Sequence, residues 1–237
     1  MAAALLAATV PVAPAGGRPL NIPHEQVVAL LRHVAITPLS VPDDLMVDAV
    51  DRAALVELVA TELRGAGAEV VPPGETGPAL TVAAGANGAR ADPAAGGVDD
   101  ERWKATLRDA EKSLRGGRGV DCLLLVGLRT SQAAVANGLA RWNGAAEDPL
   151  TGAARAFQGR RPRMLGLSVA VWLYGPEGDL LYWRRGGLRL LYKLGAGGQV
   201  VPVADADLLA DPVRNARAVG LALGPLLERP AGAGSAP

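Results

Sequence analysis

The stretch that most constrains the fold is residues 164–174, which read MLGLSVAVWLY. Aliphatic side chains occupy every second position from Leu165 to Leu173. A period of two places these side chains on one face of a β-strand. A Gly-Pro-Glu-Gly turn sequence follows at 175–178, and residues 180–184 are again strand-like. The region therefore predicts a β-hairpin with a short loop.

The first half of the chain predicts a βαβ unit. Residues 34–39 have the composition of a strand, residues 49–65 carry an apolar stripe at helical spacing, and residues 68–71 form a second short strand. The crossover of such a unit is right-handed. The near-continuous apolar run at 120–128 is typical of a central strand that is covered on both faces.

Helices are also expected at residues 23–31, 101–114 and 212–227. Asp211 is the expected N-cap of the last helix, and Pro225 is expected to break or kink it near its end. Residues 74–98 are rich in Gly, Ala and Pro, which predicts a loop with at most a weak strand at 80–83. The whole order predicts an α/β fold: a mixed β-sheet built from a βαβ start and an antiparallel hairpin, with helices packed on it and a C-terminal helix.

The predicted domain organisation is simple. Residues 20–229 form one α/β domain, and its 49% hydrophobic composition is ample for a core. Residues 230–237 are expected to be a disordered tail. Residues 1–19 are a signal-like or disordered segment: they contain an apolar stretch and the small-x-small sequence at 13–15, but lack the basic start of a signal peptide.

Composition narrows the function classes. The formal charge is zero, with 24 basic and 24 acidic residues, which argues against nucleic-acid binding through bulk charge. The single cysteine, Cys122, excludes an intrachain disulfide and a cysteine-based metal site. Two histidines, His24 and His33, are too few for a zinc site. We therefore expect no metal, no cofactor and no catalytic residues.

An alternative interpretation of the sequence is that the protein is an enzyme. Asp43 and Asp44 follow the first predicted strand, where sites of α/β proteins often lie. Their carboxylates suit Mg²⁺, which would make the chain a divalent-ion-dependent enzyme acting on a small molecule. Together with Asp48, they equally suit capping of the helix that follows.

Arginines and tryptophans gather around the hairpin and give the candidate partner-binding residues: Arg141, Trp142, Trp172, Trp183, Arg184, Arg185 and Arg189. If the strands pair, these basic side chains are expected to share one end of the sheet. Such a patch suits an acidic protein, an anionic glycan or a lipid headgroup. The competing interpretation is an ordinary solvated sheet face with extended arginine stems.

Three segments resemble the bacterial cell-envelope superfamily that includes the amino-terminal domain of TolB and LpoB-type activators of penicillin-binding proteins. They are HVAITPLSVP with its helix and AEVVPP, VDCLLLVGL with ARWNGA, and LGLSVAVWLYGPEGDLLYWRRGGLRLL with DPVRNARAVGLALGPLL, and together they span roughly residues 33–228. The resemblance implies an exported, non-catalytic protein of the periplasm or cell envelope that binds other envelope proteins. The chain departs from the lipoprotein members because it has no cysteine near its amino terminus. A cytoplasmic structural subunit is the remaining alternative.

Overall fold

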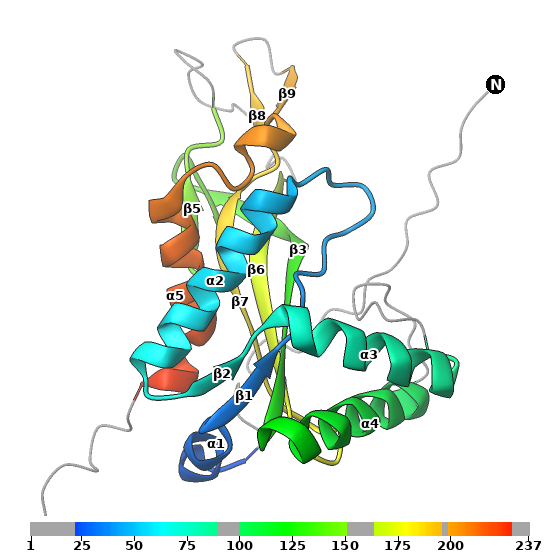
Figure 1. The fold of residues 1–237 in the computed structure, drawn as a ribbon. Helices are drawn as coiled ribbons and strands as arrows, with labels where there is room; N and C mark the ends of the chain where they lie inside the picture. Colours follow the sequence, from blue (N-terminus) through cyan, green and yellow to red (C-terminus); the bar gives the residue numbers. More distant parts are fainter. Residues whose placement is uncertain (1–21, 90–99, 151–163, 196–198, 229–237) are drawn as a thin grey trace, which may run out of the picture.

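Three long strands run through the molecule in the computed structural model, which describes residues 22–89, 100–150, 164–195 and 199–228 (Figure 1). They are β3 (Cys122–Ala136), β6 (Met164–Tyr174) and β7 (Leu180–Leu190). Strand β6 pairs antiparallel with β3 on one side and with β7 on the other. The predicted hairpin is therefore confirmed, and its first strand is central because it is hydrogen-bonded along both edges.

The βαβ unit is also confirmed. Strand β1 (His33–Ile36) lies between β2 (Glu69–Val71) and the start of β3 and runs parallel to both. Helix α2 (Ala49–Gly65) connects β1 to β2. Asp48 caps this helix, since its carboxylate accepts a hydrogen bond of 2.7 Å from the backbone N–H of Val50.

Residues 73–87 correct the sequence prediction. The structure places helix α3 (Pro73–Asn87) where a loop with a weak strand was expected. Pro73 stands at the first helical position, where a missing N–H is harmless, and Gly88 ends the helix in the left-handed conformation at φ 61°. Leu80 and Ala83 are buried against α4 (Asp100–Arg118) and the sheet. Tertiary packing therefore overrides the Gly- and Pro-rich composition.

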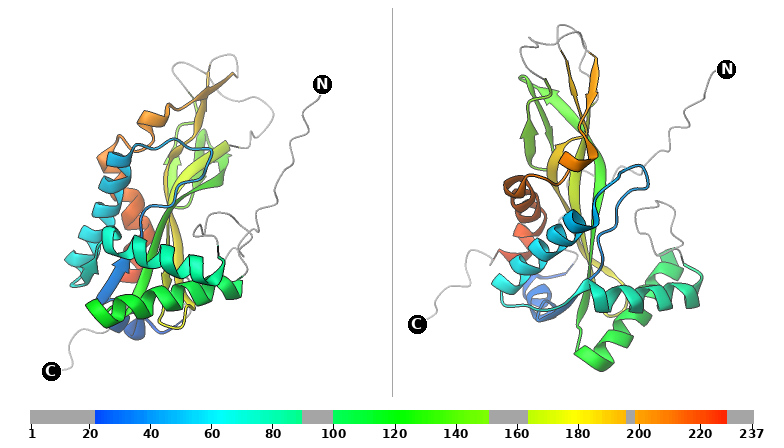
Figure 2. Two further views of the ribbon diagram at one scale, coloured as in Figure 1. Left: turned by 45° about the vertical axis from the view of Figure 1, so that its right-hand side comes forward. Right: turned by 45° about the horizontal axis from the view of Figure 1, so that its top comes forward.

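The helices form two layers, one on each face of the sheet (Figures 1 and 2). Helix α2, the short α1 (His24–Leu30) and α5 (Pro212–Leu227) pack on one face, whereas α3 and α4 pack on the other. The alternate β6 side chains Leu167, Val169, Val171 and Leu173 all lie in the core beneath α2 and α5, as the period of two predicts. Leu165 is 40% exposed because it lies beyond the helices.

In the described part of the chain, the far end of the molecule is built mainly from strands, as both views of Figure 2 show. The second half of β3 pairs with β4, and β4 pairs with β5. The small strands of this end are β4 (Leu139–Trp142), β5 (Ala145–Glu147), β8 (Tyr192–Leu194) and β9 (Val200–Pro202), followed by the 3-10 turn η2 (Asp205–Asp207). An Asn-Gly turn joins β4 to β5, with positive φ at Asn143 and Gly144. The β4–β5 hairpin folds over the sheet, so that the N–H of Gly187 in β7 donates to the carbonyl of Asn143 at 2.8 Å.

Helix α5 has the predicted bounds, but Pro225 does not break it as expected. The Asp211 carboxylate accepts hydrogen bonds from the backbone N–H groups of Val213 and Arg214. Pro225 lies inside the helix, which continues to Leu227. The missing N–H of Pro225 removes one intrahelical hydrogen bond, and only two residues of the helix follow it. Within the described residues, no helix is both long enough and apolar enough to cross a membrane.

Candidate binding site on the sheet face

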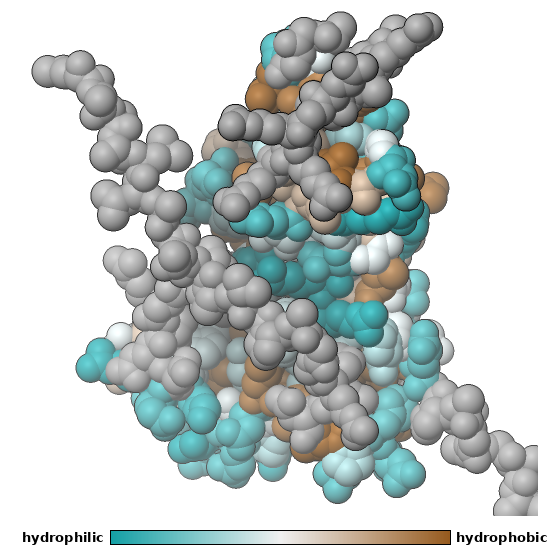
Figure 3. Space-filling model, turned by 180° about the vertical axis from the view of Figure 1, so that it is seen from behind, coloured by the Kyte–Doolittle hydropathy of each residue, from teal (hydrophilic) through white to brown (hydrophobic). Residues whose placement is uncertain are grey.

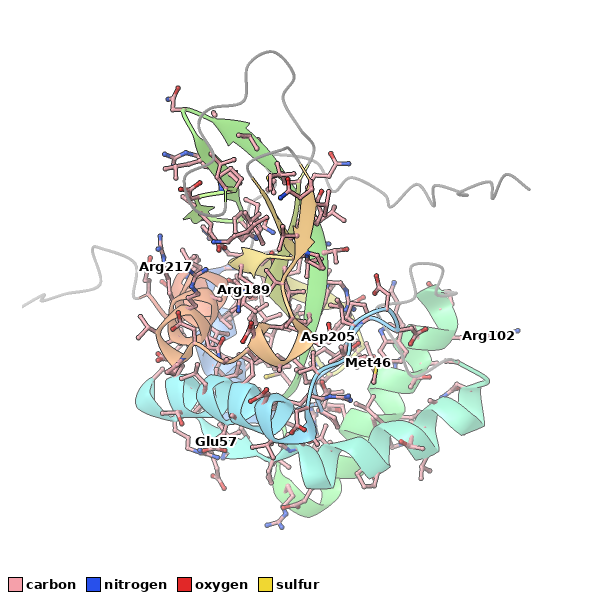
Figure 4. The ribbon with its side chains drawn as sticks, turned by 90° about the horizontal axis from the view of Figure 1, so that it is seen from above. Met46, Glu57, Arg102, Arg189, Asp205 and Arg217 are labelled. Carbon is pink, nitrogen blue, oxygen red and sulfur yellow. The ribbon has the colours of Figure 1, made fainter. Side chains whose placement is uncertain are left out.

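The strand register separates arginines that are neighbours in the sequence. Arg184 is opposed to Val171 and shares its face, which is covered by α5, whereas Arg185 is opposed to Ala170 on the other face. Arg189 is opposed to Leu167 and lies on the α5 side. Figure 4 shows Arg189 near Arg217 of α5, with Arg102 of α4 across the sheet. The expected single basic patch is therefore divided between two faces.

Two candidate partner-binding residues, Arg189 and Arg141, lie away from the tryptophans of the hairpin. Arg189 donates to the backbone carbonyl of Asp207 in η2. Arg141 is exposed on β4, between Ala134 and Ala146 of the neighbouring strands. Neither side chain lies next to the tryptophans of the hairpin, and the structure does not bring them together with Arg185.

Trp142 is a core residue rather than part of an exposed surface. Only 5% of it is exposed, and its indole N–H donates to the carbonyl of Leu167 at 3.0 Å. It packs with Met164 and Leu190 in a small core at the distal end. Gly166 makes room for it, because a Cβ at this position would overlap the indole ring.

Trp172 and Trp183 do lie together. They are directly opposed on β6 and β7, on the same face as Arg185. The Arg185 guanidinium carbon lies 5.6 Å from the centroid of the Trp183 ring, within range of a cation–π interaction. Arg129 of β3 takes the same position over Trp172, at 4.8 Å. We call these four half-buried side chains the arginine–tryptophan face.

Arg129 was missed from the sequence, although a signal for it exists. On a strand, residues 125, 127, 129 and 131 share one face, and Leu125 of this series is opposed to Trp172. If the predicted central strand is extended by one residue, its alternation places Arg129 on the same face as Leu125, which is the face that carries Trp172. The sequence prediction ended this strand at residue 128, one residue before the arginine.

Arg185 lies in a polar setting without an acidic partner. Its Nη1 donates to Ser131 Oγ at 3.3 Å, and the Asn143 amide donates to Ser131 and to the buried Ser168 at 2.9 and 2.8 Å. The buried Nε of Arg185 has no hydrogen-bond partner, and no carboxylate of the described residues lies within ion-pair distance of this side chain. Burial lowers the pKa of Arg185. A half-buried cation with this surrounding is stabilised by an anion.

Several other arginines of the protein, unlike Arg185, are paired with a carboxylate. Carboxylates pair with Arg64 (Glu57, 2.7 Å), Arg115 (Glu111, 2.5 Å), Arg118 (Glu75, 2.8 Å) and Arg214 (Glu147, 3.0 Å). Seen from behind, the molecule carries a band of hydrophilic side chains across its middle, between more hydrophobic regions toward either end (Figure 3). The middle of the molecule, between the end covered by helices and the end built from strands, is therefore polar on the surface seen from behind.

A cavity of about 310 Å³ opens where β1 ends. Its lining is mostly apolar and comes from the segment after β1, from α3, from α4 and from β3: Thr37, Pro38, Leu39, Ser40, Val41, Gly77, Leu80, Thr81, Trp103, Leu125 and Val126. Helix α2 leaves β1 on one face of the sheet, whereas α3 and α4 return to β3 on the other. In α/β folds, binding sites are common at the carboxyl end of a parallel strand where the connections from neighbouring strands go to opposite faces of the sheet. We call it the β1 cavity.

The arginine–tryptophan face adjoins the β1 cavity at Gly127. A Cβ on this glycine would lie 3.2 Å from Arg129 Nη1, 3.2 Å from the carbonyl oxygen of Ser40 and 3.3 Å from the Trp172 ring. Ser40 itself lines the cavity. The Arg129–Trp172 pair therefore lies close to Ser40 without lining the cavity itself, and the absence of a side chain at Gly127 permits this close approach.

The described part of the structure gives no support for a metal site at the acidic residues after β1. Asp43 and Asp44 are exposed and do not line the β1 cavity. Among the described residues, no group of three or more His, Cys, Asp or Glu side chains is arranged to hold a metal ion. His33 lies between Asp121 and Glu69, at 3.1 and 3.4 Å.

The remaining histidine and the cysteine have structural surroundings. His24 Nε2 contacts the Leu226 carbonyl at 3.2 Å. Cys122 is fully buried, its thiol contacts the Leu30 carbonyl, and burial raises its pKa far above the usual range. A thiol held protonated in this way is a poor nucleophile.

Comparison with known proteins gives no match: no family model, no curated protein and no solved structure is similar to this chain. The functional argument therefore depends on the site itself and on the sequence features described above.

Proposed function

We propose that this chain is a non-catalytic protein of the periplasm or cell envelope that acts by binding another envelope protein through its arginine–tryptophan face. The observation that carries the proposal is Arg185, a half-buried guanidinium beside Trp183 that has no carboxylate partner among the described residues. The envelope assignment is supported by the signal-like residues 1–15 and by the resemblance to the TolB and LpoB superfamily.

The chemistry of the face suits a protein partner. Tryptophan and arginine are enriched at the energetically dominant positions of protein interfaces. An acidic side chain of the partner would pair with Arg185, and the rings of Trp172 and Trp183, opposed to each other at the next level of the same face, would supply apolar contact area. A charge-assisted hydrogen bond between guanidinium and carboxylate is roughly twice as strong as a neutral one.

The test uses two adjacent arginines on opposite faces. Arg185→Glu should abolish recovery of the partner after crosslinking and affinity purification from native cells, while Arg184→Glu, which changes the same charge on the α5 face, should leave it intact. Equal recovery with both variants would remove the proposal. Recovery of lipid or glycan in place of a protein would replace the protein partner by that class.

The compartment is tested separately. Amino-terminal sequencing of the mature protein should find a start after residue 15. A mature protein that retains Met1 would contradict export and favour the cytoplasmic alternative.

A further inference from the structure

Strand β7 has one edge without a neighbouring strand. It is 11 residues long and, among the described strands, it pairs with β6 alone. Proteins commonly bind an extended peptide by adding it as a further strand to such an edge. We infer that the outer edge of β7 binds an extended acidic segment of the partner protein as an added β-strand. The inference rests on the proposed function and specifies how the partner binds.

The direction of the backbone groups along β7 follows from one hydrogen bond. The N–H of Gly187 donates to the Asn143 carbonyl in the β4–β5 turn, so it points away from β6. Backbone groups alternate in direction along a strand, and the β6–β7 register is regular from residue 182 to residue 187. The N–H and C=O groups of Arg185 and Trp183 therefore also point away from β6. No described residue forms a hydrogen bond with these outward backbone groups.

The pairing of β3 gives the same direction independently. The N–H of Leu128 donates to the Ser40 carbonyl and therefore points away from β6. The preceding residue, Gly127, points toward β6, where it is opposed to Ala170. Ala170 thus directs its backbone groups toward β3, which leaves the opposed Arg185 without a backbone bond to β6.

The open part of the edge ends where the strand-built end of the molecule begins. Gly187 is bonded to the β4–β5 turn, and the N–H of Leu190 donates to the Glu147 carboxylate at 2.9 Å. An added strand would therefore pair beside residues 182–186, which span about 17 Å of extended chain. This is the usual length of a strand in a globular protein.

The side chains at this edge specify the chemistry of the segment. Arg185 and Trp183 are two positions apart and share one face. The Nη2 of Arg185 forms no hydrogen bond with any described residue and is not buried. A residue of the added strand opposed to Arg185 is favoured by opposite charge, and one opposed to Trp183 by apolar contact. The segment should therefore carry an acidic residue two positions from a β-branched or aromatic one.

A second copy of this chain is a poorer occupant of the edge. Antiparallel pairing of two β7 edges would bring Arg184 and Arg185 of one copy close to the same arginines of the other. Like charges opposed across a sheet destabilise it. Charge therefore favours a different, acidic protein.

Hydrogen exchange of the full chain, followed by NMR, tests whether the edge is open. The amides of Trp183 and Arg185 should exchange at least about tenfold faster than that of Arg184, whose N–H points toward β6. Equal protection of these amides would overturn the inference, whereas the proposed function would still stand on the loss of the partner with Arg185→Glu.

A proline variant tests whether the edge binds the partner. Trp183→Pro and Trp183→Ala both remove the indole, but only proline also removes the outward N–H. Recovery of the partner after crosslinking should be at least about tenfold lower with Trp183→Pro than with Trp183→Ala. Equal recovery with both variants, or complete loss with Trp183→Ala, would overturn strand addition.

Folding of the variants is checked by circular dichroism and urea unfolding. Trp183→Pro should unfold at the same urea concentration as Trp183→Ala, because its N–H forms no bond to β6. Arg184→Pro should unfold at a lower concentration than Arg184→Ala, since it loses a bond of the sheet. Failure of Trp183→Pro to fold would contradict the outward direction of its N–H, and recovery of a second copy of this chain as the partner would contradict the acidic occupant.

Discussion

Replacement of Gly166 by alanine tests the packing of the strand-built end. The added Cβ would overlap the indole of Trp142, which cannot move freely because it donates to the Leu167 carbonyl and packs with Met164 and Leu190. Overpacking of a core by one methyl group destabilises by about 1–3 kcal/mol. Displacement of the indole also removes a buried hydrogen bond, at about 1 kcal/mol. We expect Gly166→Ala to lower the free energy of unfolding by about 2–4 kcal/mol.

The measurement is equilibrium unfolding in urea, with a double-mutant cycle. Trp142→Phe removes the part of the ring that the new Cβ meets, so Gly166→Ala should be milder in that background by at least about 1 kcal/mol. Gly85→Ala is the control, because no atom lies within 4 Å of its added Cβ and alanine is the better helix former. A Gly166→Ala variant within about 0.5 kcal/mol of the parent would refute the placement of Trp142.

Three further predictions follow from contacts elsewhere. Leu167→Ala, in the core under α5, should cost about 2–5 kcal/mol in urea unfolding, whereas Leu165→Ala, 40% exposed, should cost less than about 1. Glu147 is 7% exposed, pairs with Arg214 at 3.0 Å and accepts a hydrogen bond from a backbone N–H of β7. Glu147→Ala should therefore lower the free energy of unfolding in urea by about 2–4 kcal/mol. An unchanged free energy of unfolding would contradict this buried network. The backbone N–H of Arg214 is the main cause of the lowered pKa of Asp211. The stability that Asp211 contributes is therefore present above about pH 4 and is lost as the pH falls through its folded pKa, so Asp211→Asn should make the urea midpoint less dependent on pH below about pH 4. An unchanged slope would exclude this linkage.

The elements that the sequence predicts well are those whose side-chain period and packing agree. Residues 164–174 alternate because one face lies under α2 and α5, and the run at 122–128 is uniformly apolar because helices cover both of its faces. Helix α3 has no such pattern. Its glycines and prolines lower its intrinsic helix propensity, and its stability comes from Leu80 and Ala83 against α4, which no local pattern shows.

The candidate site was only partly predictable, because its composition depends on register. Trp172, Trp183 and Arg185 were identified from their proximity in sequence, but so were Arg184 and Arg189, which lie on the other face. A register shift near Leu167 and Ser168 alters the pairing along β7, and no sequence pattern gives its position. The β1 cavity is formed by four segments that are distant along the chain, so only the fold brings its lining together.

The glycine pair at 186 and 187 explains why the arginine–tryptophan face is where it is. Consecutive residues of a strand point to opposite faces, and here both faces are closely covered. A Cβ on Gly186 would overlap the backbone of α5 at Ala218, and a Cβ on Gly187 would lie 2.6 Å from the carbonyl oxygen of Trp142. Strand β7 is therefore held between α5 and the β4–β5 turn, and it has no freedom to rotate about its axis. Arg185, one residue earlier, is consequently directed to the α4 side beside Trp183 by backbone packing, so its orientation does not depend on finding a partner.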